Sequence, residues 1–167
     1  DSFVWLGLRN VEHYELTRAA DVLGLDELLV EDALSVTQRA KVEVDGDRVT
    51  AVFKILGYVE ETSDVETGQI AVFVGPSFVL SVRMGEPGDL RDMRSRLEGD
   101  FELLQAGPLA VLHGILHAAV VDLIDRLATA AVHNPLFGSY EILLSENGSS
   151  DGTVAVNGAL AVRGAHT

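Results

Sequence analysis

The sequence predicts an α/β protein of the α+β type, with a mixed, largely antiparallel β-sheet sandwiched between helical layers and a long helix at its end. Three observations support this fold class. Segments with helical periodicity flank the β-rich part of the chain on both sides. The β-rich part contains two pairs of runs joined by short turns, which is typical of antiparallel hairpins. The strands of the second pair are almost continuously apolar, which indicates that helices cover both faces.

The first third of the chain predicts one strand and two helices. The apolar run FVWLGL at residues 3–8 predicts a buried strand. In residues 12–23 the apolar positions follow i, i+3, i+4 and i+7, so we expect a helix that Gly24 ends in a left-handed conformation. Asp26 is a suitable N-cap for a second, short helix at residues 27–34.

Four runs rich in β-branched and aromatic residues follow, at 41–44, 49–59, 69–74 and 78–82. The turn Asp45-Gly46-Asp47 joins the first two, and Gly75-Pro76-Ser77 joins the last two. These turns predict two hairpins, and the acidic residues 60–66 between them are interpreted as a linker.

Two further helices are predicted after the hairpins. Leu90, Met93 and Leu97 form one apolar stripe of a helix that Gly99 closes. Pro108 suits the first turn of the longest helix, which we expect to reach about residue 131.

The character of the sequence changes after this long helix. We therefore expect one domain at residues 1–132 and a divergent tail at 133–167. Within the tail, residues 140–145 could form a strand, and an Asn-Gly pair at 157–158 is typical of a hairpin turn.

Charge and composition exclude several classes of function. The chain has 12 Lys and Arg against 26 Asp and Glu, a net charge of −14, which argues against a nucleic-acid partner and favours cations or basic surfaces. It has no cysteine, so disulfides and thiolate metal sites are excluded. The stretch 103–121 lacks charge but contains Gln105, Gly107 and two histidines, so we interpret it as part of an amphipathic helix and expect a soluble chain.

Motifs for catalysis are missing from the sequence. It contains no GxSxG elbow, no Gly-rich phosphate loop and no HExxH helix. We therefore expect that the protein is not an enzyme.

Two clusters of polar residues remain as candidate sites. His113 and His117 stand four residues apart on the long helix, a spacing that can direct two imidazoles at one metal ion, although a polar helix edge is the simpler interpretation. The cluster Arg91, Arg94 and Arg96 is interpreted as a solvated helix face, paired with Glu98 or Asp92, rather than a phosphate site.

Glu31 and Asp32 lie in the last turn of the short helix at 27–34, where the helix dipole disfavours negative charge. Adjacent helical residues point about 100° apart, so these two acids are not expected to hold one ion together. They could instead lack counter-charge within their own subunit and face a second subunit, where a hard cation such as Mg²⁺ could join carboxylates from both sides, although an exposed pair at a frayed helix end is the simpler interpretation of these two residues by themselves.

Several segments together resemble a known family. They are FVWLGL, GLDELLVEDAL, QRAKVE, QIAVFVGPSFVLSVRMGE and GPLAVLHGIL, and their order covers residues 3–127. In this order and spacing the chain resembles the N-terminal cytoplasmic domain of the CorA magnesium and cobalt transport family. The resemblance implies a domain with a mixed sheet between helical layers.

The resemblance also implies a function. Relatives form pentamers around a central pore, and each subunit reaches the membrane through a stalk and two C-terminal helices that are missing here. It implies a cytoplasmic regulatory domain that senses Mg²⁺, or Co²⁺, at the inner face of the cell membrane. By the same resemblance, Asp32 matches an acid of an intersubunit metal site, Glu31 matches the acid beside it, and His117 stands where some relatives carry an acid of a second metal site.

Two alternatives stay open at this point. One is the head domain of a zinc-transporting relative, in which His113 and His117 would matter more. The other is a free-standing acidic metal-binding domain, since residues 133–167 do not resemble the charged stalk that would supply the partner of Asp32.

Overall fold

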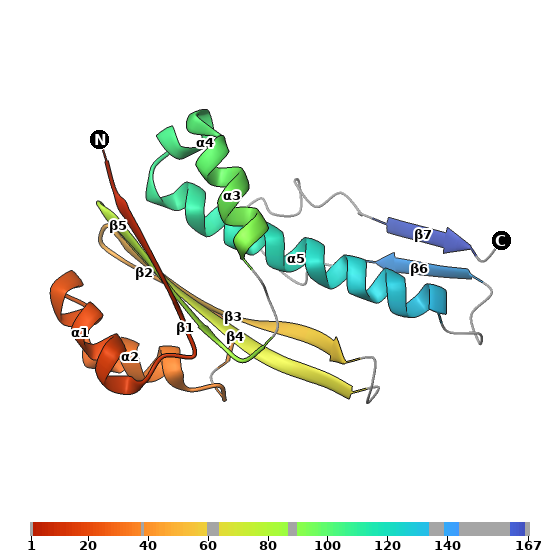
Figure 1. The fold of residues 1–167 in the computed structure, drawn as a ribbon, viewed down its shortest axis with the longest axis horizontal. Helices are drawn as coiled ribbons and strands as arrows, with labels where there is room; N and C mark the ends of the chain where they lie inside the picture. Colours follow the sequence, from red (N-terminus) through yellow and green to blue (C-terminus); the bar gives the residue numbers. More distant parts are fainter. Residues whose placement is uncertain are drawn as a thin grey trace. The chain divides into compact units, whose positions relative to one another are not determined.

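The computed structural model describes residues 2–37, 39–59, 64–86, 90–133, 139–143 and 161–165. Figure 1 shows the chain as a ribbon. The chain divides into two compact units, Asp1–Ala119 and Val120–Thr167. All of the sites discussed below lie in the first unit.

A five-stranded sheet forms the centre of the first unit, in the order β1-β5-β4-β3-β2. Its strands are β1 (Val4–Arg9), β2 (Lys41–Asp45), β3 (Arg48–Val59), β4 (Asp64–Gly75) and β5 (Phe78–Met84). Strand β1 runs parallel to β5, and every other neighbouring pair in this sheet is antiparallel. The predicted mixed, largely antiparallel sheet is confirmed, and so are both hairpins.

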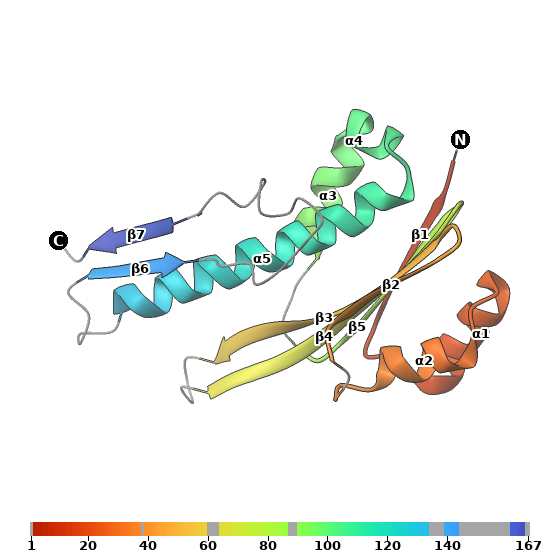
Figure 2. The same cartoon turned by 180° about the vertical axis from the view of Figure 1, so that it is seen from behind.

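Helices cover both faces of this sheet, as Figures 1 and 2 show from opposite sides. Helices α1 (His13–Leu23) and α2 (Glu27–Leu34) lie on one face. Helix α3 (Arg91–Gly99), the short α4 (Phe101–Gln105) and the first half of α5 (Pro108–His133) lie on the other.

The predicted helix signals act as expected in α1 and α2. Gly24 ends α1 in the left-handed region, with φ of 65°, and its N–H donates to carbonyl oxygens of the last turn. The Asp26 side chain accepts a hydrogen bond of 2.9 Å from the Leu28 N–H at the start of α2. The chain therefore turns sharply between the two helices and lays both on the same face of the sheet.

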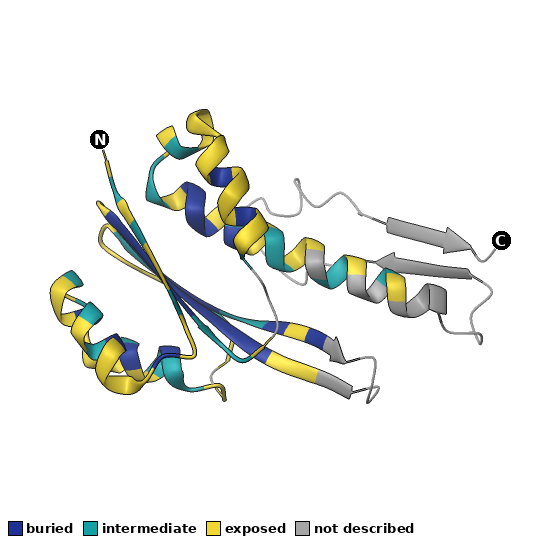
Figure 3. Cartoon of the chain, viewed as in Figure 1, coloured by how far each residue is buried: buried dark blue, intermediate teal, exposed yellow. Residues whose placement is uncertain are grey.

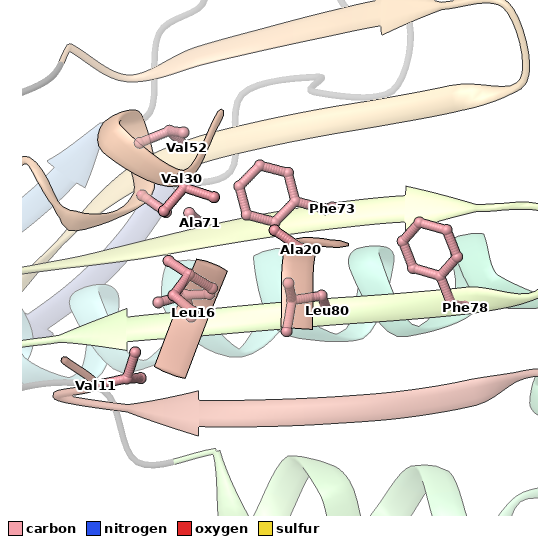
Figure 4. Close-up of a cluster of buried hydrophobic side chains, with 11 residues drawn as sticks. Val11, Leu16, Ala20, Val30, Val52, Ala71, Phe73, Phe78 and Leu80 are labelled. Carbon is pink, nitrogen blue, oxygen red and sulfur yellow. The ribbon is translucent and has the colours of Figure 1, made fainter. Parts of the chain in front are cut away.

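The core beneath α1 and α2 is built from alternate residues of the three inner strands. Phe73 of β4 and Leu80 of β5 point toward Leu16 and Ala20 of α1 and Val30 of α2, as the close-up in Figure 4 shows. Because strand side chains alternate between faces, the intervening residues belong to the second core.

The second core lies beneath α3 and α5. Ile70 and Val72 of β4 contact a cluster that includes Met93 of α3 and Val111 and Ile115 of α5. The apolar parts of β4 and β5 are consequently buried on both faces, and Figure 3 colours these parts as buried. The prediction from their continuous apolar runs is confirmed.

Two predictions about elements need correction, and one element was missed. Strand β1 is an exposed edge strand rather than a buried one, with Val4 68% and Leu6 40% exposed, because in this sheet it pairs with β5 on one side and has no neighbour on the other. The supposed linker at 60–66 contains the start of β4, since Asp64 pairs with Val59. Helix α4 was not predicted.

The second unit contains the rest of α5 and a two-stranded antiparallel sheet of β6 (Ser139–Leu143) and β7 (Ala161–Ala165). The predicted strand near 140–145 is confirmed by β6. The Asn-Gly signal lies outside the described residues.

Residues Pro108–Asp125 of α5 form the one described helix that is long and apolar enough to cross a membrane by length and composition. A helix packed against a sheet meets the same criterion. Val111, Leu112 and Ile115 of this segment belong to the second core.

Candidate functional site

The C-terminal end of α2 is held by two polar side chains of the sheet. The fully buried Gln69 of β4 donates through Nε2 to the carbonyl oxygens of Asp32 and Ala33, at 3.1 Å each. Lys54 of β3 donates from Nζ to Gln69 Oε1, at 2.6 Å, and to the carbonyl oxygen of Val36. Orphan carbonyls at the end of a helix carry partial negative charge, so these contacts offset the dipole at the point where Glu31 and Asp32 lie.

Asp32 forms an ion pair within its own chain. Its Oδ2 lies 2.7 Å from Nζ of Lys41 on β2, and its side chain is 19% exposed. The same ammonium group donates to both carboxylate oxygens of Glu43, at 3.1 and 3.2 Å. The expectation that Asp32 lacks counter-charge in its own subunit is therefore wrong, because β2 places a lysine directly against it.

The pKa of Lys41 is raised above its usual value, chiefly by the hydrogen bond to Asp32 and then by that to Glu43. Both carboxylates favour the charged ammonium. By contrast, burial lowers the pKa of Lys54, because desolvation disfavours its charged form.

A pocket of about 580 Å³ opens beside this ion pair, between α2 and the β2–β3 hairpin. Its charged lining residues are Asp26, Asp32, Lys41, Glu43, Asp45 and Arg48. Carboxylates outnumber cationic groups here, and one of the cations, Arg48, donates to the carbonyl oxygen of Gly24 at 2.5 Å. The pocket therefore has a negative bias that Lys41 offsets only in part, and it can attract a cation.

Glu31 does not point into the pocket beside Asp32. It is exposed and is not among the residues that line the pocket, in keeping with the 100° between adjacent helical side chains. In the part of the chain that the structure describes, no three His, Asp or Glu side chains converge as ligands for one ion. A cation at Asp32 would have to complete its coordination with water or with another subunit.

His117 lies on the other side of the sheet from Asp32, because α5 and α2 cover opposite faces. Its ring and that of His113 have centroids 6.2 Å apart, and both line a second pocket of about 270 Å³. Asp100, at the junction of α3 and α4, lines this pocket as well. Within one chain the structure thus separates the predicted metal ligands into two places.

Lys41, Lys54 and Gln69 were missed by the sequence reasoning. Lys41 lies in the segment QRAKVE, but only the pairing of β2 with β3 shows that it reaches back to Asp32. A single glutamine at the start of an apolar strand carries no local signal for a partner on a helix 36 residues away.

A pH titration should detect the Asp32–Lys41 pair. We expect Lys41→Met to lower the free energy of unfolding by about 1 kcal/mol or less near neutral pH, because partly exposed ion pairs contribute little. Because the folded pKa of Lys41 is raised, this contribution is fully present below the ordinary lysine pKa of about 10.4 and is lost as pH rises through the folded value. Urea unfolding of Lys41→Met and of the unsubstituted protein across this pH range measures the difference in the free energy of unfolding. Lys54, whose pKa shifts in the opposite direction, is present in both proteins, so its contribution cancels. A difference that grows above the ordinary lysine pKa would contradict the assignment.

Comparisons with known proteins agree with the fold. Three solved structures are similar over 77% of this chain. The soluble domain of CorA from Methanocaldococcus jannaschii and the complete CorA magnesium transporter of the same organism each show 15% sequence identity and a TM-score of 0.57. The full-length CmaX protein shows 17% sequence identity and a TM-score of 0.60. The match spans only 52%, 40% and 39% of their respective lengths. A search of curated protein sequences gave no significant match.

The family assignment comes from the sequence itself. The sequence model described as CorA-like Mg²⁺ transporter protein matches residues 1–132 of the 167-residue chain. This match includes the whole five-stranded sheet and the helices on both of its faces. The chain therefore belongs to the CorA-like Mg²⁺ transporter family.

Proposed function

We propose that this chain is the cytoplasmic regulatory domain of a CorA-type Mg²⁺ or Co²⁺ transport channel, and that it senses divalent cations at Asp32. The observation that carries the proposal is the pocket with an excess of carboxylates beside Asp32, in a chain that belongs to this family. The domain performs no chemistry, and its role is to bind a cation in one state of the assembly better than in another.

The contact between Lys41 and Asp32 suggests how such a sensor operates. Without a divalent ion, the ammonium group of Lys41 bridges Asp32 and Glu43. A hard divalent cation prefers carboxylate oxygens and carries twice the charge of an ammonium group, so at sufficient concentration it displaces Lys41. The lysine thus sets the concentration at which the site fills.

A second subunit completes the coordination in this proposal. Asp32 alone supplies one carboxylate, and Glu31 is exposed on the adjacent face of α2, where it can approach a neighbouring chain. In a symmetric pentamer at the inner face of the membrane, cations between subunits would favour the closed assembly, and their loss would permit opening.

Substitutions at the ion pair test the proposal in opposite directions. We expect Asp32→Asn to weaken Mg²⁺ binding about tenfold or more, because a ligand charge is lost, and Lys41→Met to strengthen it about tenfold, because the competing ammonium is removed. Isothermal titration calorimetry of the 167-residue chain with Mg²⁺ and Co²⁺ measures both changes.

Asp21→Asn is the matched control, since Asp21 is an exposed acid on α1 outside the pocket and its substitution changes the net charge equally. Binding curves for Asp32→Asn that coincide with those of the unsubstituted protein would refute the role of Asp32. An equal loss of Mg²⁺ affinity in Asp21→Asn would show that the effect comes from the net charge of the protein and not from the position of Asp32.

The adjacent rings of His113 and His117, with Asp100 at the same pocket, support a second candidate, a zinc-handling relative. Imidazole suits Zn²⁺ better than Mg²⁺. The same titration with Zn²⁺ decides between the two candidate functions. A clearly higher affinity for Zn²⁺ than for Mg²⁺ that disappears in His117→Ala would favour the zinc-handling relative.

A further inference from the structure

The chain has only two lysines, and their ammonium groups have different partners. Lys41 of β2 donates to two carboxylates. Lys54 of β3 donates instead to two neutral oxygens, Gln69 Oε1 at 2.6 Å and the carbonyl oxygen of Val36. Among the described residues, no carboxylate pairs with Lys54. Full negative charges therefore stabilise the ammonium of Lys41, whereas only dipoles stabilise that of Lys54.

The contacts of Lys54 suit the neutral amine as well as the ammonium ion. An ammonium group has three N–H donors, and two of those of Lys54 go to Gln69 and Val36. Loss of the third proton keeps both hydrogen bonds and leaves a lone pair that points away from the two acceptors. At Lys41, by contrast, Nζ faces three carboxylate oxygens at 2.7–3.2 Å, so loss of a proton removes a charge-assisted hydrogen bond.

Burial acts in the same direction as these contacts. Desolvation lowers the pKa of Lys54, while the hydrogen bonds to Asp32 and then to Glu43 raise the pKa of Lys41. The neutral amine is the nucleophilic form of lysine, so Lys54 has the larger nucleophilic fraction at a given pH. Lys54 is half-buried, and Val36, which its Nζ contacts, is 54% exposed, so a small reagent can reach this amine from solvent.

We propose that Lys54 is a modification site, whose amine takes an acyl group from an acyl phosphate. The lone pair of Nζ attacks the acyl carbon, the bond from this carbon to the phosphate oxygen breaks, phosphate leaves with the bonding electrons, and one amine proton passes to water. The product is a neutral amide. A carbamate formed with CO₂ would instead place a negative charge at the C-terminal end of α2, where the helix dipole disfavours it, so an acyl group fits this place better.

Acylation changes how β3 holds the end of α2. The resulting amide has a single N–H, which cannot serve both Gln69 Oε1 and the carbonyl oxygen of Val36. The positive charge beside the negative end of the helix is lost as well. The segment that carries Asp32 is then held less tightly. A consequence for cation binding rests on the proposed function, whereas the acylation itself does not.

Acetyl phosphate is the probe, and Lys41 is the internal control. The 167-residue chain is treated near pH 8, and peptide mass spectrometry follows the acetylation rate at each lysine. Both lysines are half-buried, so exposure alone predicts similar rates. We expect Lys54 to react about tenfold faster than Lys41, because the neutral fraction of an amine depends steeply on its pKa. In concentrated urea the two rates should become similar, because unfolding removes the partners of both amines.

Lys54→Arg connects the modification to the structure. Arginine keeps the positive charge and the donors but stays protonated, so it is not acylated. We expect treatment with acetyl phosphate to lower the Tm of the unsubstituted protein by about 3 °C and that of Lys54→Arg by less than about 1 °C. Thermal unfolding of untreated Lys54→Arg verifies that the fold is retained.

Three results would overturn the proposal. Lys41 could react as fast as Lys54 in the folded chain, which would show that the carboxylate partners do not decide the reactivity. The preference for Lys54 could persist in urea, which would assign it to the local sequence. Treated Lys54→Arg could lose as much stability as the treated unsubstituted protein, which would show that acylation of Lys54 does not loosen the fold.

Discussion

Replacing Gln69 by leucine should lower the free energy of unfolding by about 3 kcal/mol, although leucine is apolar like the residues that follow it in the strand. Gln69 is fully buried and holds two carbonyl oxygens of α2 and the ammonium group of Lys54. Leucine would leave these groups without the amide, and each buried polar group left unsatisfied costs about 1–3 kcal/mol. Urea unfolding followed by circular dichroism measures the loss.

Two further variants make this result specific. Thr67→Val, at an exposed position of the same strand, should change stability by less than about 0.5 kcal/mol. The double variant Gln69→Leu with Lys54→Met should recover part of the loss, because removing both partners is less costly than removing one. A stability of Gln69→Leu within about 0.5 kcal/mol of the unsubstituted protein would show that the amide does not hold α2.

The elements that the sequence predicted well are those with strong local signals. The helix at 12–23 has an apolar period and a terminating glycine, and the second hairpin has a Gly-Pro turn between apolar runs. Local chemistry is enough to specify such segments. The structure places the helix and the second strand of the hairpin within a residue or two of the expected bounds, whereas the first strand, β4, starts at Asp64 rather than at Gln69.

The parts that could not be predicted depend on which strands become neighbours. The run FVWLGL is apolar enough for a central strand, but its partner is β5, with Val4 opposite Phe78, and this pairing leaves β1 at the edge of the sheet. Likewise, Arg9 and Arg83 become neighbours only through the same parallel pairing. Single-sequence patterns carry no information on contacts at such separations.

The metal role of Asp32 stays a prediction, and its electrostatic surroundings could not be predicted from the sequence. Asp32 lies at a pocket with other acids, as a cation site needs, but the pairing of β2 with β3 supplies Lys41 as an internal counter-ion. The excess of acids alone therefore does not show whether a carboxylate is free to bind a metal. Whether a carboxylate can bind a metal depends on where the fold places the lysines that could pair with it.

Replacing Phe73 by alanine should have the largest effect on stability, a loss of about 4 kcal/mol. The ring is 2% exposed and packs in the core beneath α1 and α2, where alanine leaves a cavity that the surrounding strands and helices cannot close. Val44→Ala on β2 is the control, since Val44 is 71% exposed and should change stability by less than about 0.5 kcal/mol. Urea unfolding monitored by the fluorescence of Trp5 measures both.

This prediction also joins the core to the candidate cation site. Phe73 lines the pocket beside Asp32, so its removal loosens the contact between α2 and the sheet. Where the fold survives, we expect Phe73→Ala to bind Mg²⁺ less tightly than the unsubstituted protein, because a carboxylate on a less ordered helix must be fixed when the cation binds. If Phe73→Ala loses stability but binds Mg²⁺ unchanged, the polar contacts of Asp32, among them those with Gln69 and Lys41, fix its position without the packing of Phe73. If its stability is also unchanged, the core beneath α2 does not pack as described.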